Sequence, residues 1–173
     1  MRGRTGEVPV VFVTVGTDHH PFTRLMDSIE RWPARSMASV VVQHGTAQPV
    51  TGAESHRLLD TSDMDHWLRT ADAVVCAAGP GTVMGARRAG IRPVVVPRRA
   101  ESGEHVDNHQ CAFGRHLDVT GLALVVDTGE PLYAALDRLF IDLDAYRIAP
   151  DPGTPVGIAR TGEAIDALVR GRM

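Results

Sequence analysis

The sequence has few aromatic residues, few cysteines and no strong excess of either charge. Aromatic side chains make up 5% of its 173 residues, which argues against the base-stacking surfaces of single-strand nucleic-acid binders. The formal net charge is −3, so nothing draws the chain strongly to nucleic acid or to an anionic membrane. The two cysteines, Cys76 and Cys111, lack the CxxC spacing of zinc and redox motifs. These absences predict a reducing, cytoplasmic setting and no nucleic-acid partner.

Long apolar runs and the common nucleotide-binding motifs are also missing. No run approaches the ~20 apolar residues of a membrane-spanning helix, and Met1–Glu7, a polar arm, lacks the apolar core of a signal peptide. We therefore expect a chain that is soluble by itself and reaches the inner face of a membrane only through a partner. The GK[ST] of a Walker loop and the GxGxxG of dinucleotide-binding turns do not occur, which argues against NAD and FAD.

Short apolar, β-branched runs alternate along the chain with segments of helical periodicity. Such alternation predicts an α/β fold with a doubly wound parallel sheet of about five strands. Neither a repeat nor a shift in composition divides the sequence, so residues 1–173 are expected to form one domain. The expected strands are Val8–Val15, Ser39–Gln43, Ala73–Ala77, Pro93–Pro97 and Leu122–Val126, with a weaker candidate at Arg57–Asp60.

The helical segments are recognised by their apolar spacing and by their end signals. Pro21 suits the first turn of a helix that ends at Trp32, before Pro33. Ser62 or Asp63 can cap the next helix. Residues 141–173 are read as a proline- and glycine-rich segment followed by a terminal helix. The further expected helices are Thr82–Ala89, one that begins near Asp107, Pro131–Phe140 and Ile158–Val169.

Three loops leave strand carboxyl ends and should open on one edge of the sheet, where ligands bind in open α/β folds. They are Gly16–His20, His44–Thr46 and Ala78–Thr82. Glycine permits a close backbone approach, and a helix N-terminus behind it favours an anion. The candidates for a diphosphate cradle are Gly16, Thr17, Gly79, Gly81 and Thr82. A purely structural turn is the alternative explanation of the same glycines.

Several of these segments together carry a family resemblance that covers roughly Val8 to Val126. By the order and separation of the segments listed below, the chain resembles the C-terminal, donor-binding half of family 28 glycosyltransferases. It is most similar to the single-domain form found in two-subunit enzymes that act on dolichol-linked sugar or on bacterial exopolysaccharide. The matching pieces are Val13–Thr17, Pro21-Phe22, Arg24-Leu25, Gln43–Gly45, Ala71–Val75, Gly79–Thr82, Ala89-Gly90, Pro93, Val96–Arg98 and Glu104–Gln110.

The resemblance implies a Rossmann-like domain that is one half of a GT-B glycosyltransferase. It implies a nucleotide-sugar donor, usually UDP-linked, on this half, and a membrane-associated acceptor-binding subunit as partner. It implies neither a metal nor a cofactor, because helix N-termini and backbone amides neutralise the leaving diphosphate. On the family pattern Gly16, Thr17, Gly81 and Thr82 face the diphosphate. Asp107 and Gln110, which flank Asn108 in the same motif, resemble the carboxylate and amide that grip the donor sugar.

Two positions depart from the family pattern. Many relatives carry a histidine where this chain has Ala77, and most carry a ribose-binding glutamate where it has Gly85. The missing carboxylate removes a charged hydrogen bond of about 1.5–3 kcal/mol. The first hypothesis is therefore an inverting glycosyltransferase subunit that is inactive without its partner. The alternatives are a catalytically silent nucleotide-sugar-binding or scaffold subunit, and a domain that binds an unrelated phosphorylated ligand.

Histidines in two loops have a possible chemical role. His19 or His20 is a candidate catalytic base for an acceptor hydroxyl, although the family pattern places the base on the other half. The H-x-D-x-H formed by His105, Asp107 and His109 suggests a metal site on first sight. At a helix start, residues two apart point about 200° away from each other, so we predict that these side chains do not converge and bind no metal.

Two further groups admit a structural and a functional interpretation. Met64, Trp67 and Leu68 are interpreted as core residues of a helix. Arginines that follow the second glycine loop are either a solvated helix face or a dock for a partner or lipid phosphate. These arginines are Arg87, Arg88, Arg92, Arg98 and Arg99.

Overall fold

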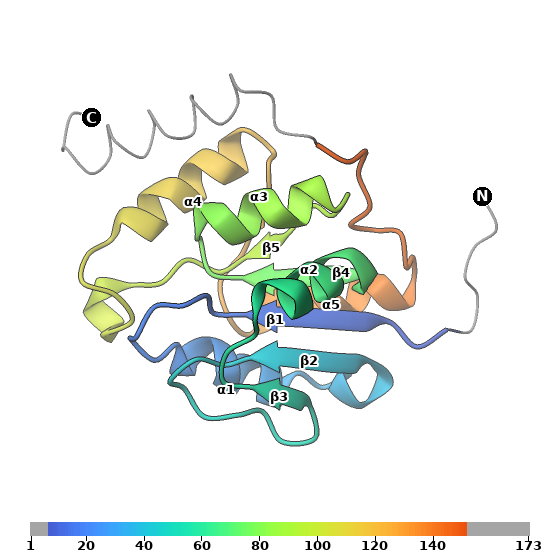
Figure 1. Cartoon of the computed structure of the whole chain (residues 1–173), viewed down its shortest axis with the longest axis horizontal. Helices are drawn as coiled ribbons and strands as arrows, with labels where there is room; N and C mark the ends of the chain where they lie inside the picture. Colours follow the sequence, from blue (N-terminus) through green and yellow to red (C-terminus); the bar gives the residue numbers. More distant parts are fainter. Residues whose placement is uncertain (1–6, 152–173) are drawn as a thin grey trace.

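The structure, a computed structural model, describes residues 7–151 (Figure 1). The predicted terminal helix Ile158–Val169 lies outside the described residues, and only Glu7 of the predicted N-terminal arm Met1–Glu7 lies within them. Within the described part, no helix is both long enough and apolar enough to cross a bilayer.

A six-stranded parallel sheet in the order β3-β2-β1-β4-β5-β6 forms the centre of the molecule. The central strands are valine-rich and buried along nearly their whole length, because helices cover both faces of the sheet. The predicted doubly wound parallel sheet is therefore confirmed. The strands are β1 (Val10–Thr14), β2 (Ser39–Gln43), β3 (Glu54–His56), β4 (Ala73–Cys76), β5 (Val94–Val95) and β6 (Leu124–Val125).

Helices lie in two layers on the sheet (Figure 1). One layer holds α1 (Thr23–Arg31) and α5 (Glu130–Asp137), which are joined where Trp32 Nε1 donates to Asp137 at 2.8 Å. The other layer holds α2 (Thr61–Thr70), α3 (Pro80–Arg88) and α4 (His109–Val119). Short 3-10 helices lie at η1 (Arg35–Met37), η2 (Ala100–Ser102) and η3 (Arg138–Phe140).

The third strand differs from its prediction. It is Glu54–His56 and not Arg57–Asp60, and it raises the strand number from about five to six. Its side chains are polar or half-exposed because it is an edge strand, which backbone pairing with β2 holds in register from Val41↔Glu54 to Gln43↔His56. A hydrophobic pattern therefore could not have located it.

Two helix starts also differ from prediction by a few residues. Helix α1 begins at Thr23, so Pro21 precedes the first turn. Helix α2 is capped by Asp60, whose carboxylate accepts from the N–H of Asp63 at 2.9 Å, and not by Ser62 or Asp63. Both starts lie in polar runs where several residues can serve as a cap, and local geometry selects one of them.

The direction of winding reverses at β1, which has β2 on one side and β4 on the other. The chain moves from β1 to β2 through α1 and returns from β3 to β4 through α2. In open α/β sheets this reversal opens a crevice at the carboxyl ends of the two central strands. The fold therefore directs attention to the loops that follow Thr14 and Cys76.

Candidate functional site

A cavity of about 310 Å³ lies at that crevice, between the loop after β1 and the start of α3. It contains six of the residues predicted to bind the donor: Gly16, Thr17, Gly79, Gly81, Thr82 and Gln110. The remaining lining residues are Val15, Asp18, Met64, Ala77 and Pro80. Ligand pockets start at about this size, so one wall of a larger cleft fits the dimensions.

The N-terminus of α3 forms one side of the cavity and is prepared for an anion. Gly79 is the N-cap and has no side chain that could occupy the site, and Pro80 opens the helix without an N–H of its own. The first helical hydrogen bond runs from Val83 N to Gly79 O at 3.1 Å. Among the described residues the N–H groups of Gly81 and Thr82 have no partner. Free N–H groups at the positive end of a helix attract a phosphate.

The loop after β1 forms the opposite side and is fixed from below. Gly16 has a φ of 75°, which favours glycine, and its N–H donates to Thr14 Oγ1 at 3.2 Å. Its carbonyl accepts from Gln43 Nε2 at 2.9 Å, and Thr14 in turn contacts Gln43. The peptide groups of Gly16 are therefore engaged inside the protein, and Thr17 is the residue of this loop that is exposed at the cavity.

Gln110 has a structural function in addition to the predicted sugar-binding one. Its Oε1 accepts from the N–H groups of Ala78 and Arg98, each at 3.2 Å, and the residue is 6% exposed. This oxygen ties together the carboxyl ends of β4 and β5. Within the part of the chain that the structure describes, its Nε2 makes no hydrogen bond, so the amide NH₂ is the group left for a ligand.

Asp107 and Asn108 lie outside the cavity lining. Asn108 Oδ1 accepts from Ala100 N at 2.9 Å and so holds the turn before α4. The side chain of Asp107 is 59% exposed and accepts from the N–H of His109 at 3.0 Å. The N–H and ring of His109 lower the pKa of Asp107, which keeps it a carboxylate. A donor that reaches Asp107 must therefore extend beyond the cavity toward the start of α4.

Asp18 joins the histidines of the two loops. It accepts from His20 N and from His20 Nδ1, both at 2.7 Å, and it pairs with His105 Nε2 at 3.0 Å. Burial raises the pKa of Asp18, but the hydrogen bonds from His20 and the charges of Arg98 and His105 outweigh it and lower the pKa overall. The side chain of His19 is 83% exposed. The candidate base His20 is thus oriented by a close carboxylate contact, whereas His19 lies 4.0 Å from the same Asp18 oxygen.

The geometric argument against convergence of the H-x-D-x-H residues is wrong. Helix α4 begins only at His109, so the preceding residues follow a bent loop, and ligand atoms of His105, Asp107 and His109 lie within 4.8 Å of one another. Burial lowers the pKa of His105, and the neighbouring His109 lowers it further, while Asp18 and Asp107 oppose the change.

Three residues of the family motif have positioning roles that the sequence did not predict. Glu104 is 3% exposed and forms a bidentate pair with Arg24, whose Nε and Nη2 donate to it at 2.8 and 2.9 Å. Arg98 is fully buried over the ring of Phe22, at 4.7 Å from its centroid. Its guanidinium donates to the carbonyls of three loop residues: Val15, His20 and Glu104. The positioning roles of Arg24, Arg98 and Glu104 could have been predicted only by considering which buried polar groups a charged side chain can hydrogen-bond.

The proposed basic cluster does not form one surface, so neither of its two interpretations describes all its members. Arg98 is in the core, and Arg87 and Arg92 donate to the carbonyls of Leu122 and Ala123 at 2.9 and 3.1 Å. Arg88 is exposed, and Arg99, whose side chain is 39% exposed, pairs with Asp127.

The predicted core residues of α2 behave as expected, with one addition. Leu68 is buried, and Met64 and Trp67 pack against the main hydrophobic cluster. Met64 also lines the cavity, a second role that its helical spacing did not reveal. Cys76 is buried in β4, and burial raises the pKa of its thiol to about 12, so it is unreactive.

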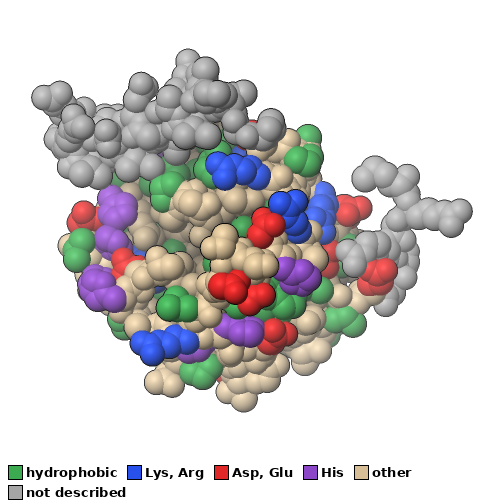
Figure 2. Space-filling model, viewed as in Figure 1, with side chains coloured by type: hydrophobic (Ala, Val, Ile, Leu, Met, Phe, Trp, Pro, Cys, Tyr) green, Lys and Arg blue, Asp and Glu red, His purple; other side chains and the backbone are tan. Residues whose placement is uncertain are grey.

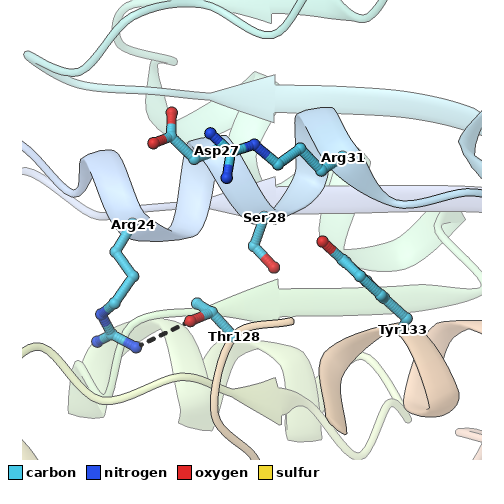
Figure 3. A pocket seen from close by; sticks show the side chains of 6 residues that line it. All are labelled: Arg24, Asp27, Ser28, Arg31, Thr128 and Tyr133. Carbon is cyan, nitrogen blue, oxygen red and sulfur yellow. Dashed lines mark hydrogen bonds between the residues drawn. The ribbon is translucent and has the colours of Figure 1, made fainter. Parts of the chain in front are cut away.

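A second cavity of about 370 Å³ lies between α1 and the segment that leads into α5 (Figure 3). Arg24 reaches across it to Thr128 Oγ1 at 3.4 Å, but the same guanidinium is already paired with Glu104 and Asp127. Asp27 also lines this cavity and opposes an anion there. The first cavity, which combines free helix N–H groups with the strand crossover, is therefore the candidate site.

The fold and this site together define a Rossmann-like domain of the kind that forms the C-terminal half of GT-B glycosyltransferases. Residues 10–147 match the family described as the glycosyltransferase family 28 C-terminal domain, and this chain belongs to that family. The chain is 35% identical over 82 residues to a curated relative from Xylella fastidiosa (strain M12). That relative is named UDP-N-acetylglucosamine--N-acetylmuramyl-(pentapeptide) pyrophosphoryl-undecaprenol N-acetylglucosamine transferase. The match covers 47% of this chain but only 21% of the relative.

Solved structures support the same fold. The chain superposes on a glycotransferase of kitacinnamycin with a TM-score of 0.59 at 20% identity, covering 94% of this chain and 39% of that one. The calicheamicin glycosyltransferase CalG4 gives a TM-score of 0.57 at 19% identity, with 97% and 40% covered. MurG of Acinetobacter baumannii gives 0.53 at 18% identity, with 94% and 50% covered. This chain therefore spans half or less of the length of each.

Proposed function

We propose that this chain forms the donor-binding part of an inverting glycosyltransferase and holds a UDP-linked sugar in the cavity at α3. The observation that carries the proposal is the pair of free N–H groups at Gly81 and Thr82, directed from a helix N-terminus at the strand crossover. Membership of family 28 supports the same ligand class. The partner in this proposal is a membrane-associated acceptor-binding subunit, which recruits the chain to the cytoplasmic face.

The chemistry follows from where charge develops. An acceptor hydroxyl attacks the anomeric carbon of the donor sugar, the bond to the UDP oxygen breaks on the opposite face, and the hydroxyl proton passes to a base. The negative charge that builds on the diphosphate is stabilised by the α3 N–H groups, so that step uses no metal. His20, which Asp18 orients, is the candidate base on this chain; the family pattern assigns the base to the other half. The acceptor is a lipid-linked or polysaccharide hydroxyl.

A catalytically silent donor-binding or scaffold subunit is the second candidate, because two positions lack expected donor contacts. Ala77 offers only a methyl group to the cavity. Gly85 faces α2, where an added Cβ would lie 3.1 Å from Leu68 Cδ1. The glycine thus has a packing function between α2 and α3, which is independent of any donor.

Calorimetric titration of the full chain with UDP, UDP-N-acetylglucosamine and UDP-glucose tests the donor proposal. We expect binding tighter than about 1 mM for UDP and at least one UDP-sugar, and weaker binding of ADP and GDP. Comparable affinity for all three diphosphates would indicate a generic phosphate site. Absence of binding by every nucleotide would sink the proposal. Transfer measured with the partner subunit then separates the enzyme from the silent subunit.

Gly85→Glu is expected to bind UDP about tenfold more tightly than Gly85→Ala. Position 85 lies one helical turn after Gly81, and its Cβ direction leads toward Leu68 of α2. Helical side chains lean toward the N-terminus, so we expect the longer glutamate side chain to run back past Leu68 toward the start of α3, where the proposed donor lies. A charged hydrogen bond contributes about 1.5–3 kcal/mol, part of which solvent exposure removes. The alanine variant is the matched control, since both variants press on Leu68 and both remove a helix glycine. Equal affinities in the two variants would show that the missing carboxylate does not limit donor binding.

A further inference from the structure

The loop before α4 gathers three metal-ligating side chains. His105, Asp107 and His109 each offer a ligand atom, and these atoms lie within 4.8 Å of one another. His105 Nδ1 lies 3.7 Å from Asp107 Oδ1, and His109 Nδ1 contacts the same carboxylate oxygen. The two imidazole rings meet edge to face with centroids 4.4 Å apart. Figure 2 shows histidine side chains gathered beside acidic ones at the left of the molecule, where the strands end in Figure 1.

The backbone turns these three side chains to one side. Asp107 Oδ1 accepts from the N–H of His109 at 3.0 Å, which closes a tight turn just before the helix. The loop is anchored at its start by Glu104, which is 3% exposed and paired with Arg24. A short loop fixed at both ends presents its ligands in a defined arrangement before any ion arrives, which reduces the entropy cost of binding.

A second carboxylate, from the loop after β1, orients the first histidine. Asp18 Oδ2 lies 3.0 Å from His105 Nε2. A carboxylate only accepts hydrogen bonds, so Nε2 carries the ring proton, and Nδ1, which accepts from the N–H of Asp107 at 3.5 Å, carries the lone pair. In protein metal sites, a histidine ligand usually donates the N–H of its other ring nitrogen to a carboxylate or carbonyl, as His105 does to Asp18. Asp18 is itself held by His20, so the contact joins two separate loops.

We propose that His105, Asp107 and His109 bind a divalent transition-metal ion of the Zn²⁺ or Co²⁺ class, with Asp18 as the carboxylate that orients His105. Two imidazoles and one carboxylate suit such ions, whereas Mg²⁺ and Ca²⁺ prefer oxygen ligands throughout. Ligands at ~2.0–2.1 Å from a tetrahedral ion lie about 3.4 Å apart, close to the 3.7 Å between His105 Nδ1 and Asp107 Oδ1. His109 Nδ1 is hydrogen-bonded to the same Oδ1, so His109 must turn its ring or offer Nε2 to bind the ion. Three protein ligands leave one position for water or for a ligand hydroxyl.

The proposed ion binds Asp107, the carboxylate that the family pattern assigns to the donor sugar. Any link between the ion and the donor rests on the proposed function, whereas metal binding itself does not. Zinc binding with no nucleotide affinity would leave the metal site in place and remove the donor proposal. Nucleotide affinity without zinc binding would do the reverse.

The test is a calorimetric titration of the EDTA-stripped full chain with Zn²⁺, together with the visible absorption of Co²⁺. We expect one ion per chain with an affinity at or below about 10 μM. His109→Asn and Asp107→Asn should each weaken it at least tenfold, and Asp18→Asn by about tenfold with unchanged stoichiometry. His19→Asn is the control and should leave the affinity unchanged, because His19 is not among the three proposed ligands. His19 belongs to a second group, formed with Asp18 and His20, whose ligand atoms also lie within 4.8 Å of one another. Thermal unfolding establishes that each variant is folded. If His109→Asn does not fold, Asp107→Asn takes its place as the test variant, because Asp107 is exposed.

Two results would overturn the assignment. The first is a Zn²⁺ affinity weaker than about 1 mM, or binding that no variant alters, which would mean that scattered surface histidines account for it. The second is a larger loss in His19→Asn than in His109→Asn, because the ion would then belong to Asp18, His19 and His20.

Discussion

UDP affinity should fall at least tenfold further in Gly81→Asp than in Gly81→Asn. An aspartate at this position puts a negative charge at the N-terminus of α3, where the proposed diphosphate lies. Two unit charges about 4 Å apart repel by roughly 4 kcal/mol at an effective dielectric of 20. The exposure of Gly81 reduces this to an expected ten- to hundredfold loss of affinity. Calorimetric titration with UDP measures the difference.

The same substitution should not weaken the fold. A Cβ at Gly81 meets no atom within 4 Å, and the residue does not have a positive φ. An acidic residue in the first turn stabilises a helix by about 0.3–1 kcal/mol, so the melting temperature of Gly81→Asp should equal or exceed that of Gly81→Asn. Loss of binding with an intact melting curve therefore reports charge repulsion. Equal UDP affinities in the two variants would place the diphosphate elsewhere.

The sheet was predictable from sequence wherever its strands are buried. Runs such as Val10–Thr14 and Ala73–Cys76 must be apolar because helices cover both of their faces, and their burial left a clear pattern. The edge strand Glu54–His56 needs only backbone pairing with β2, so its residues carry no such signal. Prediction of strands thus failed where a strand carries no run of apolar side chains.

The candidate site divides in the same way. Gly16, Gly79 and Gly81 were named as candidates because a backbone without side chains allows an anion to approach closely, and all three line the cavity. Their role in binding a diphosphate stays a prediction. The contact of Asp18 with His105 joins loops far apart in the sequence, and no local spacing encodes it. The H-x-D-x-H argument failed because it assumed helical geometry for residues that precede α4.

Arg98 was the clearest error, since it was grouped with surface arginines although it is fully buried. Burial lowers the pKa of its guanidinium, and the charges of Asp18 and Glu104 oppose that change. Burying an arginine is tolerable here because loop carbonyls need its donors and the ring of Phe22 covers it. A composition-based reading cannot detect such carbonyls, because they belong to the backbone. Arg98 therefore joins the loop after β1 to the loop that leads into α4.

Arg98→Met is expected to lower the free energy of unfolding by about 3–5 kcal/mol, because it leaves the carbonyls of Val15, His20 and Glu104 without their donor. For a protein of this size that corresponds to a fall of roughly 10 °C in melting temperature. Arg98→Lys keeps the charge but cannot reach three carbonyls at once, so it should be intermediate.

The matched control is Arg69→Met, which removes an arginine whose side chain is 67% exposed and whose pair with Asp65 is on the surface of α2. The melting temperature of Arg69→Met should be indistinguishable from that of the parent chain. Arg98→Lys, where folded at the assay temperature, should also bind UDP-sugars more weakly, since the two loops that flank the donor are no longer tied together. If Arg98→Met has the same melting temperature as the parent chain, the carbonyls that Arg98 contacts must accept from water or from other donors. The guanidinium would then not be the group that holds the two loops together.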